Sequence, residues 1–278
     1  MIGVTSQTFL QLNDGRPMPQ VGLGVWQSPA DTTADTVATA LAAGYLAIDT
    51  ASAYRNEPGV GEGVKRSGAA RDKLFITTKL WNENQGHDAA LAAFDKSLQR
   101  LGMDYVDLYL IHWPAPAQDL YLDSWKALVR LREEGRARSV GVSNFAIPHL
   151  ERIIGETGVT PAANQIELHP RFQQEALRAF HAANGIVTTS WSPLGQGKLL
   201  EDPVIAGIAA KHGKTPAQVI IRWHIDLGLT VIPKSVTPAR IVSNLDVFGF
   251  GLDDADLAAI TALDAADGRI GPDPAKFG

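Results

Sequence analysis

Several apolar segments of this 278-residue chain end on a polar side chain that is able to do chemistry. Asp49, Lys79 and His112 each follow a short run of apolar or β-branched residues, and Asn144 and Lys234 follow two later runs. The C-terminal ends of the strands in a closed parallel barrel open onto one face, so we expect these groups to gather there. The pattern therefore predicts an enzyme.

Tyr54 lies in the loop that follows Asp49 and completes a set of groups suited to moving a proton. A free phenol has a pKa near 10, and a neighbouring ammonium such as Lys79 stabilises the phenolate and lowers that value. Asp49 would keep the lysine charged and oriented. His112 could donate a hydrogen bond to an oxygen that gains negative charge. Because neighbouring strands lie about 4.8 Å apart, these side chains are expected to form one site that protonates a carbonyl oxygen.

The elements that must position these groups alternate between strand and helix. The pattern predicts an α/β fold, a (β/α)8 TIM barrel, as one domain over residues 1–278. The expected strands are 21–26, 45–50, 74–80, 106–113, 137–144, 162–169, 186–191 and 230–235. The expected helices are 31–43, 59–67, 87–101, 120–134, 148–157, 173–183, 215–227 and 237–248, with an additional C-terminal helix over 253–263. Asn-Asp-Gly at 13–15 indicates an N-terminal β-hairpin that caps one barrel end, and the tail 264–278 has little to bury.

Composition excludes several classes of function. The formal net charge is -5 and no basic run is present, so we expect neither nucleic acid nor membrane as a partner. The chain has 0 cysteines, which excludes thiolate chemistry and Cys-ligated metal. It contains no H-E-x-x-H motif, and the Glu-Leu-His segment at 167–169 is not a recognised metal spacing. We expect no metal, and a cytoplasmic monomer with a small-molecule carbonyl substrate.

Seven stretches in order make the chain resemble the aldo-keto reductase superfamily, and most closely its bacterial 2,5-diketo-gluconate reductase branch. They are Gly-Leu-Gly-Val-Trp at 22–26, Ile-Asp-Thr-Ala-Ser-Ala-Tyr at 48–54, Thr-Thr-Lys-Leu-Trp-Asn at 77–82, Asp-Leu-Tyr-Leu-Ile-His-Trp at 107–113, Val-Gly-Val-Ser-Asn-Phe at 140–145, Asn-Gln-Ile-Glu-Leu-His-Pro at 164–170 and Ile-Pro-Lys-Ser-Val at 232–236. The resemblance implies a barrel that transfers hydride from NADPH to an aldehyde or ketone. It places the family's catalytic residues on Asp49, Tyr54, Lys79 and His112, with the tyrosine as proton donor.

The same resemblance implies where the cofactor and the substrate bind. The nicotinamide amide would be held by Ser143, Asn144 and Gln165, with the ring stacked on Trp191, where many relatives carry tyrosine. The cofactor's phosphates would lie near Ser192, Leu194, Gly195, Gln196, Lys234, Ser235, Val236 and Arg240, and Asn244 would reach the adenine. Lys234 and Arg240 would grip the 2'-phosphate, although Ser243 stands where a number of relatives carry glutamate. The substrate pocket would be walled by Trp26, Trp81 and Trp113, with Asn82 at its rim.

Each candidate also has a purely structural explanation. Lys79 and Asp49 could form a buried ion pair, His112 could be a core histidine, and Tyr54 could simply pack with a satisfied hydroxyl. The tryptophans could belong to the core, the polar residues at 143–144 and 165 could satisfy loop backbone, and the two cations could be a solvated face. The joint occurrence of four reactive groups at consecutive strand ends favours catalysis. Two rival functions are a barrel lyase that forms a Schiff base on Lys79 and a non-catalytic NADPH-binding sensor.

Overall fold

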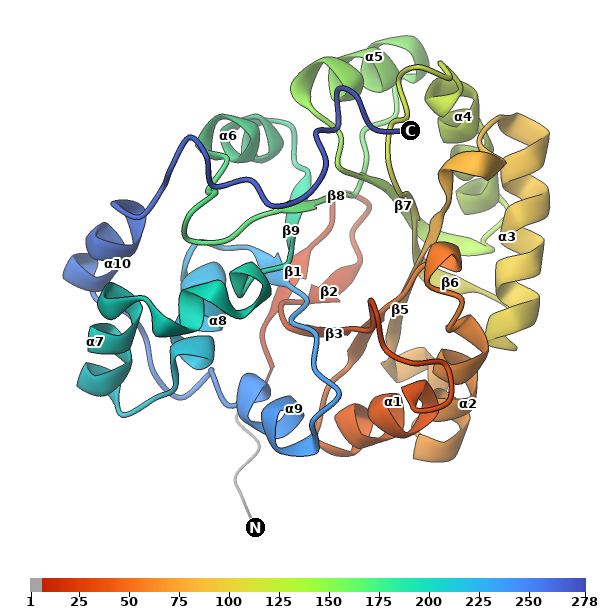
Figure 1. The fold of residues 1–278 in the computed structure, drawn as a ribbon. Coiled ribbons are helices and arrows are strands. Elements are labelled where there is room, and N and C mark those ends of the chain that lie inside the picture. The colour runs from red at the N-terminus through yellow and green to blue at the C-terminus, as the bar shows by residue number, and fades with distance from the viewer. Residues whose placement is uncertain (1–6) are drawn as a thin grey trace.

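Eight parallel strands form the centre of the protein, described here over residues 7–278 in a computed structural model (Figure 1). The strands are β3 (Gly22–Gly24), β4 (Ala47–Asp49), β5 (Phe75–Leu80), β6 (Val106–Ile111), β7 (Ala137–Ser143), β8 (Ala163–Glu167), β9 (Val187–Trp191) and β10 (Thr230–Val231). Each pairs with the next in sequence order. Parallel bridges from Val21 to Val231 and from Gly24 to Lys234 connect the first strand to the last and close the sheet into the predicted barrel.

Helices follow the strands and surround the barrel (Figure 1). They are α1 (Thr33–Ala42), α2 (Glu57–Ser67), α3 (His87–Leu101), α4 (Tyr121–Glu133), α5 (Ile147–Thr157), α6 (Glu175–Ala183), α7 (Pro203–His212), α8 (Pro216–Asp226), α9 (Pro238–Leu245) and α10 (Asp254–Thr261), with short 3-10 turns η1 (Ser52–Tyr54), η2 (Arg71–Lys73), η3 (Asn82–Asn84) and η4 (Gly195–Glu201). The predicted C-terminal helix is confirmed as α10. Gly102 and Gly158 end α3 and α5 at φ of 64° and 67°, in the left-handed region that glycine adopts without strain.

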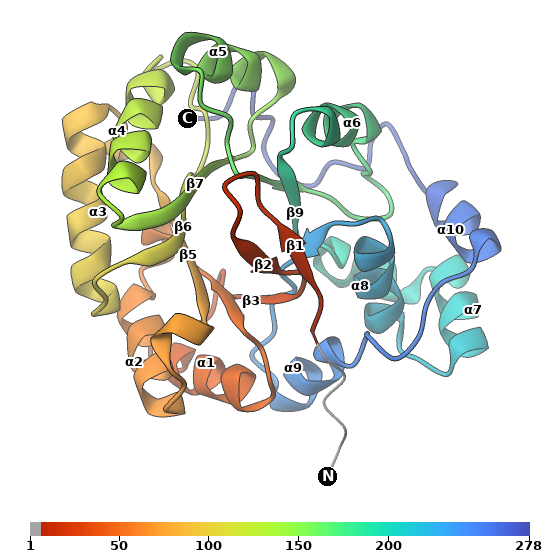
Figure 2. The ribbon, with the colours of Figure 1, turned by 180° about the vertical axis from the view of Figure 1, so that it is seen from behind.

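The N-terminal hairpin closes the end of the barrel where the strands begin. Strands β1 (Phe9–Gln11) and β2 (Pro17–Pro19) pair antiparallel, and Figures 1 and 2 place them across the barrel on the side away from the C-terminal segment. Leu12 and Met18 are 2% and 4% exposed and pack against side chains of the barrel interior, among them Leu108 and Leu110. Burying two such side chains contributes about 1.5–3 kcal/mol each. The predicted hairpin cap is confirmed.

A second layer of core lies between the strands and the helices. Ile48, Ile76 and Tyr109 on the outer face of the sheet pack with helical side chains such as Val37 and Phe94, all at most 1% exposed. Because both faces of the strands are covered, the strands read as nearly continuous apolar runs rather than alternating ones. This packing fixes the strand ends, where the candidate site lies.

Three details of the expected fold are wrong. Helix α7 was not expected, although Asp202 caps it by accepting from Val204 N at 2.9 Å, proline follows at its first position and Gly213 ends it. Several boundaries shift, and the last strand ends at Val231 rather than residue 235, because Pro233 has no N–H for the ladder. The C-terminal segment 264–278, which was expected to have little to bury, lines the candidate site with several of its residues.

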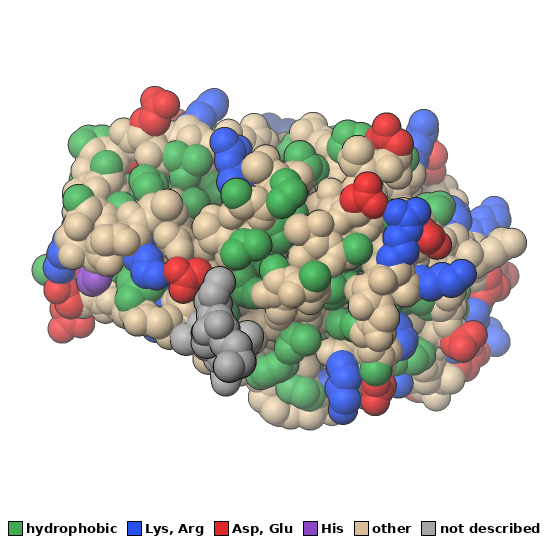
Figure 3. All heavy atoms as spheres, turned by 90° about the horizontal axis from the view of Figure 1, so that it is seen from below, with side chains coloured by type: hydrophobic (Ala, Val, Ile, Leu, Met, Phe, Trp, Pro, Cys, Tyr) green, Lys and Arg blue, Asp and Glu red, His purple; other side chains and the backbone are tan. Residues whose placement is uncertain are grey.

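The face of the molecule in Figure 3 carries basic and acidic side chains interspersed among polar and apolar ones. At the edge between α7 and α10, Lys211 Nζ donates to Asp256 Oδ1 at 2.8 Å, and His212 Nε2 lies 2.7 Å from the other oxygen. Burial raises the pKa of Asp256, but these partners and a backbone N–H outweigh it and lower the pKa to about 2. Within residues 7–278, no helix is both long enough and apolar enough to cross a membrane, and no group of three His, Asp or Glu side chains is arranged to bind a metal ion.

Candidate active site

The candidate site begins with an ion pair at the C-terminal ends of β4 and β5. Lys79 is 0% exposed, and its Nζ donates to Asp49 Oδ1 at 2.5 Å and to the Thr50 carbonyl oxygen at 2.8 Å. The parallel register that pairs Asp49 with Thr77 places the carboxylate beside the lysine strand. Two acceptors therefore hold this ammonium in one position.

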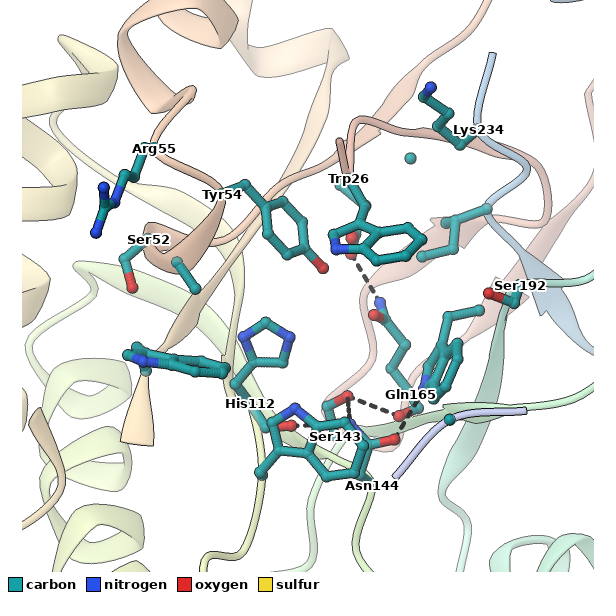
Figure 4. Close-up of a pocket in the computed structure, with 18 of the residues that line it drawn as sticks. Trp26, Ser52, Tyr54, Arg55, His112, Ser143, Asn144, Gln165, Ser192 and Lys234 are labelled. Atoms are coloured by element: carbon teal, nitrogen blue, oxygen red, sulfur yellow. Dashed lines mark hydrogen bonds between the residues drawn. The ribbon is translucent and has the colours of Figure 1, made fainter. Parts of the chain in front are cut away.

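Tyr54 and His112 complete the cluster. Tyr54 lies in η1 with its ring centroid 5.2 Å from Lys79 Nζ and 5.6 Å from the ring centroid of His112, which follows β6. Trp81 contacts His112 edge to face at 5.1 Å, and Nδ1 of the histidine is buried without a hydrogen-bond partner. Tyr54 and His112 project into the same space beside Trp26 in Figure 4. The structure thus brings together the four side chains that the sequence singled out.

The surroundings shift the pKa values of Lys79, Tyr54 and His112. Burial lowers the pKa of Lys79, but the Asp49 carboxylate and Tyr54 outweigh it and leave the value raised. Burial raises the pKa of Tyr54, and Lys79 opposes this increase without cancelling it, so the expected net lowering is not found in the free protein. Burial, and secondarily the charge of Lys79, lowers the pKa of His112 well below its ordinary value. Near neutral pH the cluster therefore holds an ammonium, a neutral phenol and a neutral imidazole.

Polar residues at the end of β7, directly after it and in β8 form a network that supports this cluster. Gln165 Nε2 donates to the second oxygen of Asp49 at 2.7 Å, and Ser143 Oγ donates to the Gln165 carbonyl at 2.7 Å. Asn144 has a left-handed φ of 62° and donates from Nδ2 to the His112 carbonyl oxygen at 3.0 Å. Its Oδ1 accepts from Trp191 Nε1 at 2.8 Å. These side chains line the pocket, and they also orient the reactive groups.

Asp49, Tyr54 and His112 line a pocket of about 1010 Å³. Ser192, Gln196 and Lys234 line it on one side, and Figure 4 shows Lys234 and Arg55 at opposite sides. Six other residues assigned to the cofactor from the sequence do not line it: Leu194, Gly195, Ser235, Val236, Arg240 and Asn244. Arg240 is exposed in the first turn of α9, and Asn244 is 5% exposed on the same helix, so both lie beyond the pocket as it is formed here.

Aromatic side chains wall the pocket near Tyr54. Trp26, Trp81 and Trp113 line it as expected, with Trp26 43% exposed at the opening. Asn82, which was expected at the rim, is 6% exposed and is not among the residues that line the pocket. The turn η3 directs Asn82 inward and leaves its neighbours Glu83 and Asn84 on the wall.

The C-terminal segment supplies a wall that sequence reasoning missed. Ile270, Gly271, Pro272 and Phe277 line the pocket, and the segment crosses the barrel mouth from α10 toward α4 and α5 in Figure 1. The Phe277 ring lies 4.6 Å from the Trp113 ring between centroids. The one signal in the sequence was an aromatic residue within an otherwise polar and glycine-rich end. Arg55, Lys96 and Arg100, also on the lining, carried no sequence signal.

Comparison with known proteins places this site in a family. A model described as the Aldo/keto reductase family matches residues 20–265. An aldo-keto reductase of Mycolicibacterium smegmatis is 60% identical over 268 residues, which are 96% of this chain and 97% of the relative. Methylglyoxal reductase DkgA of Escherichia coli K12 is 52% identical over 277 residues, covering 99% of this chain and 100% of the relative.

Solved structures agree with these matches. Gox0644 in its apo form has a TM-score of 0.94 at 55% identity, covering 97% of this chain and 98% of that chain. A mutant of Gox0644 in complex with NADPH has a TM-score of 0.95 at 53% identity, covering 98% of this chain and 99% of that chain. A family match over most of the sequence, joined by 60% identity to a named relative, shows that the protein belongs to the aldo/keto reductase family.

Proposed function

We propose that this protein reduces aldehydes and ketones to alcohols, with NADPH as hydride donor and Tyr54 as proton donor. The observation that carries the proposal is the cluster of Asp49, Lys79, Tyr54 and His112: the first, third and fourth of these line one large pocket, and the fully buried Lys79 contacts Asp49 and Tyr54. Catalytic groups with perturbed pKa values in a cleft are typical of active sites. Relatives named aldo-keto reductase and methylglyoxal reductase, and a structural neighbour in complex with NADPH, support the same reaction.

The residues in and around the pocket fit NADPH, a nicotinamide adenine dinucleotide phosphate. A volume of about 1010 Å³ is at the upper end of the range for small-molecule sites, which leaves space for a long cofactor beside a small carbonyl compound. Lys234 provides a cation on the lining, and Arg240 stands in the first turn of α9, where the N-cap Thr237 makes no side-chain capping bond. Trp191 offers an aromatic face. When bound, NADPH supplies the hydride that reduces the carbonyl carbon.

The chain's own groups manage the proton. The neutral phenol of Tyr54 would transfer its proton to the carbonyl oxygen, and the phenolate that remains would lie beside the Lys79 ammonium. Asp49 keeps that ammonium charged inside the protein, and Gln165 orients Asp49. His112 is neutral, so one ring nitrogen can donate a hydrogen bond to the same oxygen. Aromatic walls exclude water from these steps.

We propose small dicarbonyl compounds as the preferred substrates. The apolar walls formed by Trp26, Trp81, Trp113 and Phe277 suit a compact, weakly polar molecule. Relatives named methylglyoxal reductase that match 99% of the chain point to the same class. Keto-sugars are the alternative within this reaction.

The rival reaction, a Schiff base on Lys79, is disfavoured by the geometry. A lysine nucleophile must be neutral and must reach the substrate. Lys79 has a raised pKa, is fully buried and already donates to two acceptors. Borohydride trapping of a ketone on this lysine would nevertheless establish the lyase and refute the reductase.

The proposed function is tested by following NADPH absorbance with methylglyoxal, a diketone, a keto-sugar and simple aldehydes. We expect oxidation of NADPH that depends on the carbonyl compound and on the protein, with the highest kcat/KM for a dicarbonyl. Tight NADPH binding without oxidation across the panel would instead establish the sensor function. NADPH oxidation with keto-sugars alone would correct the substrate class and leave the reaction in place.

A further inference from the structure

Glu167 is a buried carboxylate that the proposed proton transfer does not use. It ends β8, is 2% exposed, and accepts hydrogen bonds from the backbone N–H groups of Ile270 at 2.6 Å and Gly271 at 2.8 Å. His169 Nε2 lies 3.2 Å from the same carboxylate. A buried carboxylate is costly unless its oxygens are satisfied, so its two partners on the C-terminal segment are part of its stability.

In the described part of the chain, these two bonds are the hydrogen-bonded link between residues 270–278 and the barrel, whereas Asp264 and Ala265 at the start of the segment bond to Gln173 and Arg171. Among the described residues, the other hydrogen bonds donated by residues 270–278 stay within the segment, where Ala275, Lys276 and Phe277 donate to Asp273. Beyond Gly271, the segment is held by aromatic packing of Phe277 on Trp113 and, at 6.4 Å between centroids, on Trp81. Glu167 therefore determines where the segment crosses the pocket.

Gly271 shows how tightly the crossing is fitted. A Cβ atom on this residue would overlap the Trp191 ring and would lie 2.8 Å from Glu167 Oε2. The backbone at Gly271 thus lies directly on Trp191, the residue proposed to stack on the cofactor. One segment contacts the cofactor side of the pocket through Gly271 and the substrate side through Phe277.

We infer that Glu167 is a positioning residue that clamps the backbone at Ile270 and Gly271, and so fixes residues 270–278 as a strap between Trp191 and the aromatic wall at Trp81 and Trp113. The clamp itself stands on the hydrogen bonds and the Gly271 contact. Its kinetic consequence rests on the proposed function, since a loose strap widens the space available to the substrate.

The direct test measures the order of the strap in the full-length protein. Arg269 and Lys276 are exposed trypsin sites on either side of the clamped residues. In Glu167→Gln, one of the two carboxylate oxygens that accept these hydrogen bonds is replaced by an NH₂ group, which can only donate. The negative charge that strengthens both hydrogen bonds is also lost. Hydrogen bonds to charged groups are worth about 1.5–3 kcal/mol, so we expect about tenfold or greater acceleration of amide exchange at Ile270 and Gly271 and of cleavage after Arg269.

Matched variants keep this test decisive. Glu175→Gln makes the same chemical change at an exposed position in the first turn of α6 and should leave exchange in the strap unchanged. If Glu167→Gln does not fold, Gly271→Ala tests the clamp from the strap, because its methyl group would displace the backbone from Trp191 and Glu167. Unchanged exchange and cleavage in folded Glu167→Gln, or in Gly271→Ala where Glu167→Gln does not fold, would overturn the inference, whatever substrate the protein reduces.

A kinetic cycle tests the consequence for the pocket. We expect Glu167→Gln and Phe277→Ala each to raise KM for methylglyoxal by about threefold or more, with a smaller change in kcat, and the double variant to be little worse than either. If Glu167→Gln raises KM by the same factor in the unmodified protein and in Phe277→Ala, Glu167 acts within the barrel alone. That result would refute its action through the strap. Absence of turnover in the unmodified protein would refute the proposed function, whereas the exchange result would still decide the clamp.

Discussion

Tyr54→Phe is the most informative single substitution in this protein. It removes one oxygen and leaves the ring in place, with its centroid 5.6 Å from the centroid of the His112 ring and 5.2 Å from Lys79 Nζ. The shape of the pocket is therefore preserved. Because burial raises the pKa of Tyr54, the phenol is fully protonated near neutral pH and its whole contribution as an acid is lost. A positioned general acid contributes about 10²- to 10⁴-fold, or roughly 3–5.5 kcal/mol of barrier. We expect kcat to fall by that factor.

The assay is steady-state oxidation of NADPH with methylglyoxal, together with a fluorescence titration of NADPH. Affinity for NADPH should stay within about twofold, since the substitution removes no group assigned to the cofactor. Tyr105→Phe is the control, because this tyrosine contacts Arg71 and Arg138 and does not line the pocket. In the unmodified protein, the raised pKa predicts no loss of proton donation by Tyr54 between about pH 6 and 9. Turnover of Tyr54→Phe within tenfold of the unmodified protein would refute the assignment of the proton donor.

Three further predictions concern cofactor selectivity and stability. Arg240→Ala should weaken NADPH binding by about tenfold or more and NADH binding by less than about twofold; equal losses in calorimetric titrations would remove the proposed contact to the 2'-phosphate. The lowered pKa of Asp256, about 2, predicts a contribution to the free energy of unfolding that is complete above its ordinary value and is lost as pH falls from about 4 to about 2. Urea unfolding should therefore show a flatter acid limb for Asp256→Asn than for Asp254→Asn, and identical limbs would contradict the assignment. Gly61→Ala should destabilise by about 1–3 kcal/mol, because its Cβ would overlap the Leu101 carbonyl, whereas Gly207→Ala, with nothing within 4 Å, should stabilise by about 0.5–1 kcal/mol in thermal unfolding.

Much of the fold follows from short-range patterns in the sequence. The strands are apolar because both of their faces are covered, and Gly102 and Gly158 mark helix ends because left-handed backbone favours glycine. Helix α7 carried comparable signals, since a capping aspartate precedes its proline and Gly213 follows its last residue. It went unexpected because a barrel with one helix after each strand leaves no place for it. The regular alternation of one strand with one helix therefore masked the local signals for α7.

The reactive cluster could be predicted because strand order places consecutive strand ends side by side. The net direction of the Tyr54 pKa could not, because it depends on how much water the walls exclude, and burial outweighs the effect of Lys79. The C-terminal wall of the pocket could not be predicted for a different reason. Whether a residue after the last helix turns toward the pocket depends on a contact such as that of Ile270 with Glu167, more than 100 positions away in the sequence.

Through Leu12 and Met18, the N-terminal hairpin fills the end of the barrel where the strands begin, and the residues that line the pocket lie at the other end. If NADPH and the carbonyl substrate enter through the same opening, the one that binds deeper must bind first and leave last. The order of binding and release would then follow from the depth of each site rather than from affinity alone.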